Sequence, residues 1–473
     1  MKVLVVGSGG REHALCWKIA QSPLKPEIVC APGNPGTAAL ARNVAVDAKD
    51  VTGLVKLAQK EKPDLVVVGP EDPLVAGLAD RLRDAGFAVF GPGSKGARLE
   101  GSKVFSKELL ERHRISCAQD RVFDRSGTAK SYLENCTQWP QVLKADGLAA
   151  GKGVFICHDA RSACQVVDSV MEKKSLGSAG SRIVIEEFLH GEEASVLAIT
   201  DGATILILEP VQDHKQVGEG DSGPNTGGMG VYSPVATLNR RLQRQIERDV
   251  LVPTIHALRR EEIEFRGVLF VGLMMTDGGP RVLEYNVRFG DPECQALVRR
   301  LKSDLLPILL AAAKGDLASV EPPEWDERVC VGVVAAAEGY PGTVRKGDPI
   351  EGLEEAAQVE EVVVFHAGTS SQPGGRVATS GGRVLCVTAL GKDLSEARER
   401  AYRAYDKLRY AGKFCRRDIG SRHAAKDGAE AEERAHRRPA RDPRVAEAMR
   451  SRIEKRIRAA GSAPKKDTGP AEG

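Results

Sequence analysis

The chain has 473 residues, which at roughly 150 residues per domain predicts about three domains and excludes a peptide or a single small module. Hydrophobic residues make up 42% and charged residues 28%, which is typical of a globular protein and excludes a fibre or a mainly disordered chain. Basic residues total 68 against 65 acidic ones, so the net charge of +3 gives no general reason to expect nucleic-acid binding.

Three features bear on the compartment. The first apolar run, residues 2–6, is short and leads into a glycine turn, unlike the core of a signal peptide. No uninterrupted run of about 18 apolar residues predicts a membrane span. The ten cysteines are scattered singly, with no Cys-x-x-Cys pair or zinc-like histidine spacing, and we interpret them as free thiols. We therefore expect a cytoplasmic protein without membrane contact.

The first hundred residues alternate short apolar runs with helical patterns. Strands are predicted at 2–6, 27–30, 64–68 and 88–90. Helices are predicted at 11–21, 51–60 and 74–85. This alternation indicates an open parallel sheet with helices on both faces, ending near Gly101.

The next two regions are mixed. Up to residue 320, strands are predicted at 141–144, 154–157, 183–187, 194–200, 267–275 and 281–285, and helices at 240–259 and 291–313. A proline-rich stretch at 321–326 indicates a boundary. Beyond it, strands at 329–336, 362–367 and 383–390 and a helix at 395–408 predict a small α+β domain.

The last segment, residues 421–473, holds 14 basic and 9 acidic side chains, while the rest of the chain is nearly neutral. Its composition predicts a basic, flexible extension. A helix start at Asp442-Pro443, followed by apolar residues at every fourth position, predicts a helix over residues 443–459.

A glycine turn joins the first strand to the first helix. Gly7, Gly9 and Gly10 would let backbone N–H groups at a helix start approach a phosphate. A dinucleotide site is disfavoured because Glu12 stands where its third glycine belongs, and because the second strand ends at Cys30 without an acid for the ribose. A phosphate-bearing substrate other than NAD is preferred, and a turn that serves helix packing alone remains the alternative.

A second glycine-rich loop follows Lys144 and runs through residues 147–153 between two strands. Such a loop can close over a polyphosphate while lysine ammonium groups balance the charge. A plain flexible hairpin remains the alternative. Glu186 and Glu187 end the next strand, whose backbone would suit an adenine edge and whose acids would suit ribose hydroxyls; an edge strand with solvated glutamates is the simpler interpretation.

The most pointed pattern is Glu284, Asn286 and Arg288. Because strand side chains alternate, these three project from one face, while Val287 and Phe289 point into the core. Two hard oxygen ligands beside a guanidinium are what phosphoryl transfer with a bound Mg²⁺ needs. A polar strand end would explain any one of them but not all three.

Taken in order, these motifs resemble the ATP-grasp ligases, and among them the glycinamide ribonucleotide synthetase family. The resemblance covers about residues 1–420, and its most specific runs are KADGLAAGKG and GPNTGGMG. Further matching segments are 7–14, 31–37, 68–74 (VGPEDPL), 100–103 (EGSK), 183–188, 213–215, 286–293, 365–369 and 381–390. The chain departs from the family in running some fifty residues past Gly420.

The resemblance implies an α/β fold in four parts. Residues 1–102 would form the N-terminal open parallel-sheet domain that precedes the ATP-grasp fold and binds substrate. Residues 103–325 would form the ATP-grasp domain with a mobile lid at about 123–192. Residues 326–420 would form the small C-terminal α+β domain, and 421–473 the extension.

The resemblance also implies a reaction. ATP would phosphorylate the carboxylate of glycine, and the amine of 5-phosphoribosylamine would attack the glycyl phosphate to give glycinamide ribonucleotide, ADP and phosphate. The cofactor would be Mg²⁺ or Mn²⁺, with ATP as cosubstrate. The enzyme would be a carbon–nitrogen ligase of purine biosynthesis, and we expect a monomer.

Site residues are implied at the matching positions. ATP would contact Lys103, Lys144, Gly151, Lys152, Gly153, Glu186, Glu187, Phe188, Leu189 and Glu193. The other substrates would contact Gly9, Gly10, Arg11, Glu12, Asn34, Gly36, Asp213, Lys215, Asn225, Gly227, Gly228, Met229, Arg288, Asp291, Pro292 and Glu293. Catalytic roles would fall to Arg288, Lys144, Asp213 and Lys215, and metal binding to Glu284 and Asn286.

Three other classes stay open at this point. A nicotinamide-dependent oxidoreductase is disfavoured by the missing glycine and acid. Another ATP-grasp enzyme, such as a carboxylase or a formyl-transferring relative, is the nearest rival. Nucleic acid is not expected as a partner except through weak contacts of the basic extension. Because every proposed site precedes that extension, a chain that stops at Ser421 or Arg422 is expected to keep its activity.

Overall fold

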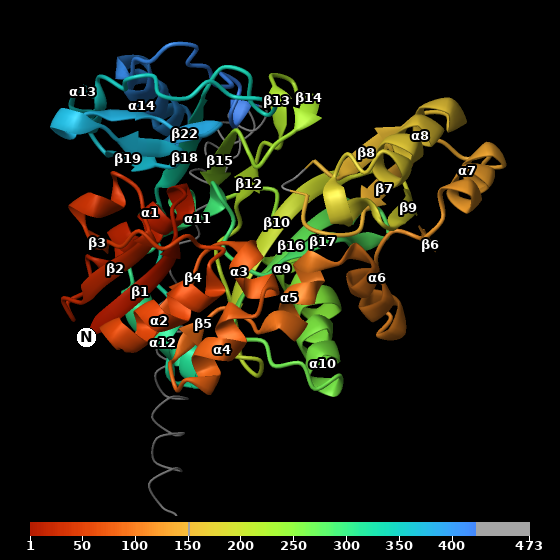
Figure 1. The fold of residues 1–473 in the computed structure, drawn as a ribbon, viewed down its shortest axis with the longest axis horizontal. Helices are drawn as coiled ribbons and strands as arrows, with labels where there is room; N and C mark the ends of the chain where they lie inside the picture. Colours follow the sequence, from red (N-terminus) through yellow and green to blue (C-terminus); the bar gives the residue numbers. More distant parts are fainter. Residues whose placement is uncertain (150–151, 422–473) are drawn as a thin grey trace, which may run out of the picture. The chain divides into compact units, whose positions relative to one another are not determined.

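The computed structural model describes residues 1–149 and 152–421, which belong to one unit of internal contacts, Met1–His423 (Figure 1). The predicted site residue Gly151 and the predicted helix over 443–459 lie outside the described residues. In the described part of the chain, no helix is both long and apolar enough to cross a bilayer.

The N-terminal region contains the predicted parallel sheet, in the order β3-β2-β1-β4-β5. Its strands are β1 (Lys2–Gly7), β2 (Glu27–Pro32), β3 (Arg42–Asn43), β4 (Leu65–Val68) and β5 (Val89–Phe90). Val3 through Val6 are almost completely shielded from solvent, as expected for a central strand covered on both faces. The order of connection reverses beside β1, so the carboxyl ends of β1 and β4 lie where open α/β sheets bind ligands.

The helices of this region differ from the prediction between residues 71 and 101, where one of them, at 94–101, was not predicted. They are α1 (Gly10–Ile19), α2 (Val51–Glu61), α3 (Glu71–Val75), α4 (Leu78–Asp84) and α5 (Ser94–Gly101). The single helix predicted over 74–85 is wrong, because the chain breaks at Gly77. That residue has φ of +81°, a left-handed conformation that glycine adopts without strain and that ends α3 before α4 begins.

An antiparallel sheet in the order β6-β9-β7-β8 follows helix α6 (Lys103–Arg112). Its elements are β6 (Asp120–Phe123), α7 (Ser126–Glu134), β7 (Gln141–Ala145), β8 (Val154–Cys157), α8 (Ala160–Val167) and β9 (Ile183–Glu187). Leu143, Ile183 and Ile185 pack in one cluster with residues of α7 and α8. Because strand side chains alternate, Lys144 and Glu186 point from the opposite, helix-free face of this sheet.

The second central sheet is antiparallel, in the order β11-β10-β16-β17. Its strands are β10 (Glu192–Thr200), β11 (Ile205–Ile207), β16 (Gly267–Thr276) and β17 (Gly279–Asn286). The predicted helix over 240–259 is present as α9 (Arg240–Ile246) and α10 (Val252–Arg260), joined by a π-helical turn.

The helix predicted over 291–313 is two helices, α11 (Glu293–Arg300) and α12 (Leu305–Lys314). The break has a local cause. The carboxylate of Asp304 accepts a hydrogen bond from the backbone N–H of Leu306 at 3.1 Å and so caps the start of α12.

The last sheet has the order β12-β15-β18-β22-β19. Its strands are β12 (Gln212–Asp213), β15 (Gly230–Ser233), β18 (Val329–Ala336), β19 (Val362–His366) and β22 (Arg383–Gly391). The remaining named elements of this region are β13 (Gln216–Gly218), β14 (Ser222–Asn225), α13 (Leu353–Ala357), β20 (Thr369–Ser371), β21 (Val377–Thr379) and α14 (Leu394–Lys407). Because β15 pairs directly with β18, the sheet joins the segment around Asp213 to the C-terminal strands.

Candidate active site

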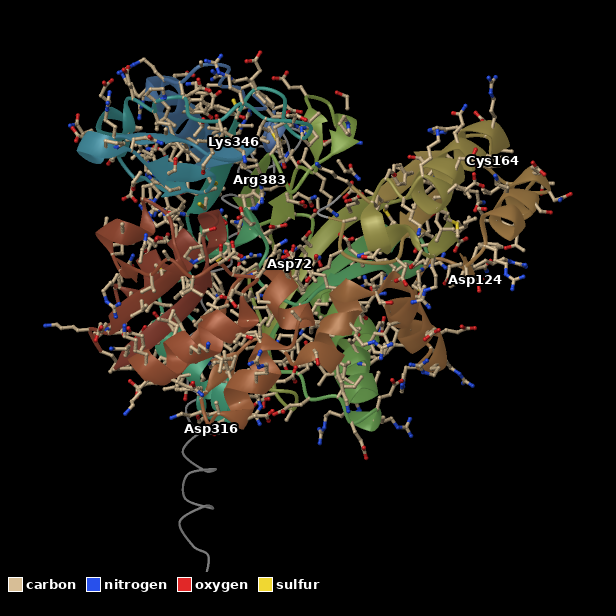
Figure 2. All side chains as sticks on the ribbon, in the orientation of Figure 1. Asp72, Asp124, Cys164, Asp316, Lys346 and Arg383 are labelled. Carbon is tan, nitrogen blue, oxygen red and sulfur yellow. The ribbon has the colours of Figure 1, made fainter. Side chains whose placement is uncertain are left out.

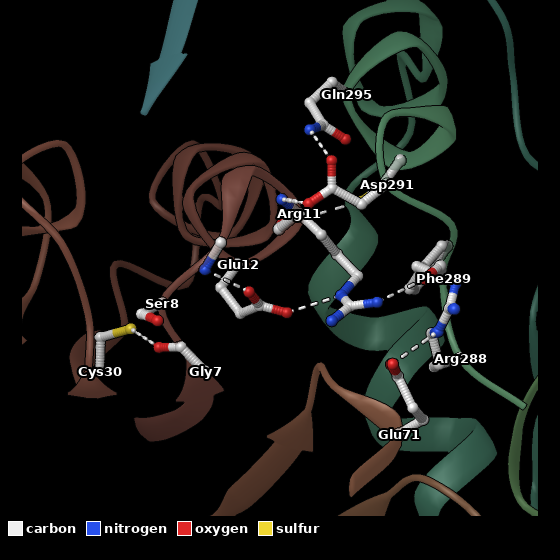
Figure 3. Close-up of polar contacts among 12 residues, drawn as sticks. Gly7, Ser8, Arg11, Glu12, Cys30, Glu71, Arg288, Phe289, Asp291 and Gln295 are labelled. Carbon is white, nitrogen blue, oxygen red and sulfur yellow. Dashed lines mark hydrogen bonds and ion pairs between the residues drawn. The ribbon is translucent and has the colours of Figure 1, made fainter. Parts of the chain in front are cut away.

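The glycine turn after β1 closes around the carboxylate of Glu12, which is only 2% exposed. Gly9 donates its backbone N–H to Glu12 Oε2 at 2.6 Å, and Arg11 Nε donates to Glu12 Oε1 at 2.6 Å (Figure 3). A Cβ at Gly7 or at Gly69 would lie 2.6 Å or 2.0 Å from the nearest atom of Glu12. Two glycines are therefore required here by an internal carboxylate, which the sequence did not reveal.

A second carboxylate meets the start of α1. Asp291 accepts a hydrogen bond from the backbone N–H of Arg11 at 3.3 Å and another from Gln295 Nε2 at 2.8 Å (Figure 3). Arg383 Nη1 lies 3.5 Å from Asp291 Oδ1. Burial alone would raise the pKa of Asp291, but the guanidinium groups of Arg383 and Arg11 lower it. The first turn of α1 and the Asp291 segment, both predicted to bind substrate, therefore contact each other.

Asn34 fixes the neighbouring loop through its own side chain. Its Oδ1 accepts from the backbone N–H of Gly36 at 2.8 Å, and its Nδ2 donates to the carbonyl of Ser8 at 2.8 Å and to that of His366 at 2.9 Å. Asn34 therefore already ties the glycine turn to β19. A direct contact of Asn34 or Gly36 with substrate remains a prediction.

Glu284 lies on β17 between two lysines. Lys103 Nζ and Lys215 Nζ each lie 3.8 Å from one of its carboxylate oxygens. Burial would raise the pKa of Glu284, but the ammonium groups of Lys215, Lys103 and Lys144 outweigh it and lower the pKa to about 2. The carboxylate is therefore ionised at neutral pH and presents hard oxygen atoms.

Asn286 ends β17, and Arg288 follows in the bend after it rather than on the strand face that was predicted. Arg288 Nη2 donates to Asn286 Oδ1 at 3.3 Å. The guanidinium is also bound by two glutamates that the sequence analysis missed: Nε donates to Glu71 at 3.1 Å and Nη2 donates to Glu100 at 2.9 Å. In the sequence, these two glutamates were indicated only by the match of their segments, VGPEDPL and EGSK, to the family. Glu71 begins α3 at the carboxyl end of β4, which places it at the reversal point of the sheet.

The two glutamates are not equivalent. Burial would raise the pKa of Glu71, but Arg288 and Arg11 lower it to about 2. Burial raises the pKa of Glu100 despite the nearby Arg288. Glu100 also accepts the backbone N–H of Val287 at 2.8 Å, so it holds both the side chain and the backbone of this strand end.

Lys144 is buried on the helix-free face of its sheet. Its Nζ lies 2.9 Å from Glu186 Oε2 and donates to the carbonyl of Leu283 at 2.9 Å. Lys107, a buried lysine of α6, lies 3.3 Å from the other oxygen of Glu186. The loop after Lys144 connects β7 and β8 as a hairpin, with Lys152 exposed at its end.

Glu187 at the end of β9 and the two residues after it already contact other parts of the protein or are buried. The carboxylate of Glu187 accepts a hydrogen bond from the backbone N–H of Gln119 at 2.9 Å and forms an ion pair with Arg281 at 2.8 Å. Phe188 packs edge-on against His190, while Leu189 is buried. A contact of these side chains with a nucleotide remains a prediction.

Asp213 and Lys215 lie on either side of His214, in the chain that leads from β12 into β13. Lys215 Nζ lies 3.3 Å from Glu193 Oε2, and Glu193 together with Asp213 keeps the pKa of Lys215 above its ordinary value in spite of burial. Burial raises the pKa of Asp213. Burial and then the charge of Asp213 raise the pKa of Glu293 to about 8.

The GPNTGGMG loop folds back on this segment. The backbone N–H of Thr226 donates to the carbonyl of Lys215 at 2.8 Å, and Arg383 Nη1 donates to the carbonyl of Gly227 at 2.6 Å. A Cβ at Gly228 would lie 2.6 Å from Pro292 Cδ. Arg383, at the start of β22 (Figure 2), was missed because its segment was matched without a role.

The loop also holds Asn225, paired with Gln216, and Met229, whose side chain is fully buried. Taken together, the described residues place charged side chains from β17, α6, the β12–β13 connection and the first turn of α1 around one region. Among these residues, no group of three or more His, Cys, Asp or Glu side chains is arranged to hold a metal ion by itself.

Three family models match the chain. They are the N domain of phosphoribosylglycinamide synthetase at residues 1–100, its ATP-grasp domain at 101–294 and its C domain at 330–422. The chain belongs to the phosphoribosylglycinamide synthetase family. The family models end at residue 422, so most of the extension lies beyond the matched region, as the sequence resemblance implied.

Curated relatives agree with this assignment to the phosphoribosylglycinamide synthetase family. A phosphoribosylamine–glycine ligase of Caulobacter vibrioides is 52% identical over 422 residues, covering 89% of this chain and 98% of the relative. The ligase of Agrobacterium fabrum is 50% identical over 429 residues, covering 91% of this chain and 100% of the relative.

Solved structures give the same fold. The crystal structure of the phosphoribosylamine–glycine ligase of Thermotoga maritima matches with a TM-score of 0.78 at 34% identity, covering 89% of this chain and all of that chain. A biotin carboxylase domain from Hydrogenobacter thermophilus, in complex with MgADP, matches with a TM-score of 0.68 at 15% identity. This match covers 87% of this chain and 91% of that domain, and at this identity it shows a shared fold alone.

Proposed function

We propose that this member of the phosphoribosylglycinamide synthetase family ligates glycine to 5-phosphoribosylamine at the expense of ATP. Glycine is first phosphorylated to glycyl phosphate, and the products are glycinamide ribonucleotide, ADP and phosphate. This reaction places the enzyme in de novo purine biosynthesis. Its identity of about half with curated ligases over nearly their whole length supports the substrate assignment.

The observation that carries the chemistry is the position of Glu284. Two lysines from different segments, Lys103 at the start of α6 and Lys215 after β12, each lie 3.8 Å from its carboxylate. Bringing together two ammonium groups and a carboxylate creates a site for a polyphosphate with its cation. In our proposal Lys103 and Lys144 neutralise the phosphates as charge moves within them, while Lys215 belongs to the site of the other two substrates.

The residues present fit a magnesium ion. Glu284 offers an ionised carboxylate, and Asn286 offers an amide oxygen on the same strand face; both are the hard ligands that Mg²⁺ prefers. A cation that keeps water and phosphate ligands needs only one or two protein oxygens, which agrees with the lack of a larger carboxylate cluster among the described residues. When bound, Mg²⁺ or Mn²⁺ would neutralise charge on the ATP phosphates.

A phosphorylated glycine solves two chemical problems. A carboxylate repels an incoming amine, and hydroxide is a poor leaving group. Transfer of the γ-phosphoryl group to a glycine carboxylate oxygen makes the carbonyl carbon electrophilic. The amine then attacks that carbon and expels phosphate. Arg288 would orient the glycine carboxylate and the acyl phosphate by charge-assisted hydrogen bonds, with its guanidinium held in place by Glu71 and Glu100.

The adenine ring has a suitable surface on the sheet of β6 to β9. Val122 and Ile156 are 41% and 49% exposed, and among the described residues few other large apolar side chains are this open to solvent. Both lie on the face that also carries Lys144 and Glu186. An apolar platform beside a lysine is what an adenine ring followed by phosphates requires. We assign this face to ATP and propose that residues 123–192 close over it and exclude water.

The remaining expectations belong to the same proposal. The enzyme acts as a monomer in the cytoplasm, with small molecules as its partners. Light scattering after size-exclusion chromatography tests the monomer directly.

The experiment that tests the function is an omission assay. Release of ADP is followed with ATP, Mg²⁺, glycine and freshly prepared phosphoribosylamine, and each component is left out in turn. We expect ADP release to require all of them and glycinamide ribonucleotide to accumulate in equal amount. Release of ADP that depends on bicarbonate instead of glycine would assign the chain to a carboxylase and overturn the proposal.

A further inference from the structure

Residues 416–420, which we call the C-terminal clasp, lie against the β13–β14 hairpin some two hundred residues earlier in the chain. Arg416 is 1% exposed and is the largest fully buried side chain in the described part of the protein. Its Nη1 donates to the carbonyl of Gln216 at 3.0 Å and to Asp221 Oδ1 at 2.8 Å. Its Nε and Nη2 donate to the two oxygens of Asp418 at 2.8 and 2.7 Å.

The clasp holds the hairpin turn at two more points. Asp418 also accepts the backbone N–H of Gly220 at 2.8 Å. The backbone N–H of Arg417 donates to Glu219 Oε1 at 3.0 Å. The carboxylate of Asp418 therefore binds Arg416 and the turn of the hairpin at once.

The end of the clasp reaches the strands that flank the hairpin. The backbone N–H of Gly420 donates to His214 Nε2 at 3.2 Å. The buried Ile419 packs so closely on Gly230 that a Cβ there would lie 2.4 Å from Ile419 Cδ1. His214 stands between Asp213 and Lys215, and Gly230 ends the GPNTGGMG loop. The clasp thus contacts both ends of the segment that carries Lys215 and residues 225–229. These residues are proposed to bind glycine or phosphoribosylamine, which we call the acceptor-side substrates.

The hairpin transmits this support to the site. Lys215 directly precedes β13, and its carbonyl accepts both the backbone N–H and the hydroxyl of Thr226, at 2.8 and 2.7 Å. Asn225 ends β14 and pairs with Gln216, whose carbonyl Arg416 binds. A shift of the hairpin would therefore move Lys215 and Asn225 together.

We propose that Arg416 is a positioning residue for the acceptor-side substrates, and that the clasp sets the placement of Lys215 and of the 225–229 loop. This inference rests on the proposed function, because it takes these residues as part of the substrate site. Arginine suits the role because its planar fork binds a carboxylate with two parallel bonds and still has donors for Asp221 and Gln216. Lysine lacks this fork.

Arg416→Met tests the proposal, with Arg416→Lys as the conservative variant. We expect Arg416→Met to raise KM for glycine or phosphoribosylamine, or to lower kcat, by about tenfold or more, since a small misplacement of site residues costs this much. The KM for ATP should stay within about twofold of the wild-type value, because the clasp binds the β13–β14 hairpin and His214, which lie outside the sheet of β6 to β9 that we assign to ATP. Arg416→Lys should recover part of the loss.

Arg417→Met is the matched control. It removes the same chemical group from the next residue, whose guanidinium pairs with Asp406 and stacks on Tyr402 and Tyr405, all on α14. We expect its kinetic constants to equal those of the wild type. Hydrogen exchange followed by mass spectrometry supplies an independent readout. Backbone amides of residues 214–230 should exchange faster in Arg416→Met than in Arg417→Met.

Asp221→Asn covers the case in which loss of the buried guanidinium prevents folding. Asp221 is exposed at the hairpin turn, and the amide keeps its size while weakening the bond to Arg416. It should change the acceptor-side constants in the same direction as Arg416→Met. Folded variants with unchanged constants and unchanged exchange over 214–230 would overturn the inference. So would a loss shared equally by the ATP constants.

Failure of the proposed function gives a different result. In that case the wild-type enzyme itself shows no glycine-dependent release of ADP. If instead the wild type is active and the Arg416 variants match it, the function stands and the positioning role is wrong.

Discussion

Arg288 Nε donates to the carboxylate of Glu71 at 3.1 Å, although the two residues are 217 positions apart in the chain. Glu71 begins α3 at the reversal point of the parallel sheet, and Arg288 follows the strand that bears Glu284 and Asn286. The N-terminal sheet and the proposed metal-binding strand are therefore joined by a charge pair at the site itself.

This pair gives the first prediction. Glu71→Gln should lower the free energy of unfolding and kcat, because it leaves the buried Arg288 with one charged partner fewer. A double-mutant cycle with Arg288→Lys, measured by urea unfolding, should give a coupling energy on the order of 1 kcal/mol or more. Asp72→Asn, at a partly exposed position on the same helix, is the control and should show no coupling with Arg288. Additive effects of Glu71→Gln and Arg288→Lys would show that the contact carries no energy.

Glu284 carries the second prediction. Glu284→Ala or Asn286→Ala should abolish turnover with little loss of stability, since each removes an oxygen proposed to bind Mg²⁺. Initial rates across a range of Mg²⁺ concentrations, together with thermal unfolding, measure both effects. Glu27→Ala, an exposed surface glutamate paired with Lys2, serves as the control. Full activity of either site variant at saturating Mg²⁺ would rule out the metal assignment.

Lys144 carries the third. Lys144→Met keeps the apolar stem but removes the ammonium group on the face assigned to ATP. We expect weaker ATP binding or a slower chemical step, by about tenfold or more, with unchanged KM for phosphoribosylamine. Lys130→Met is the matched control. Lys130 lies on α7 of the same domain and forms an ion pair with Asp168. If Lys144→Met leaves the ATP kinetics as unchanged as Lys130→Met does, the loop after Lys144 is a flexible hairpin without a role in ATP binding.

The sequence identified most strands of the N-terminal sheet and their parallel arrangement, because buried parallel strands are continuous apolar runs and glycine marks the turns between elements. It also identified Glu284 and Asn286 on one strand face, since a period of two is visible in the letters, whereas Arg288 follows the end of the strand and reaches Asn286 through a hydrogen bond. Helix breaks were harder to see. Gly77 ends α3 because it adopts a left-handed conformation, and Asp304 begins α12 through a capping hydrogen bond. Neither residue interrupts the apolar pattern from which a single helix was predicted in each region.

Partners distant in the chain were not predictable from the sequence. Glu71 in α3, Glu100 in α5 and Arg383 in β22 reach the site only because the fold brings these elements together, and nothing beside a single glutamate or arginine in the sequence indicates such a contact. The role of Glu12 was hidden for the same reason. Its neighbours Gly7 and Gly9 resemble a phosphate-binding turn, and in the folded chain they surround its carboxylate.

Buried histidines give the fourth prediction, which concerns pH. Burial, with a further contribution from His366, lowers the pKa of His13 to about 3. The unfolded chain binds a proton near the ordinary value of 6.5, so stability falls as the pH drops from 6.5 towards 3. At pH 5 this costs about 2 kcal/mol for His13 relative to pH 7.

The measurement is urea unfolding at both pH values. His13→Asn should lower stability at pH 7, since His13 accepts the backbone N–H of His366 at 2.8 Å, but should lose less on going to pH 5 than the wild type does. His256→Asn, at an exposed position of α10, should retain the wild-type dependence. An equal loss in His13→Asn and the wild type would mean that His13 does not titrate as described.

The most direct test of the whole account follows an oxygen atom of glycine. Glycine labelled with ¹⁸O in both carboxylate oxygens is incubated with ATP, Mg²⁺, phosphoribosylamine and the enzyme, and the products are analysed by mass spectrometry. A glycyl phosphate requires one labelled oxygen to leave with inorganic phosphate and the other to remain in the amide of glycinamide ribonucleotide. Inorganic phosphate without label, formed alongside the ligated product, would contradict the proposed phosphorylation of the carboxylate.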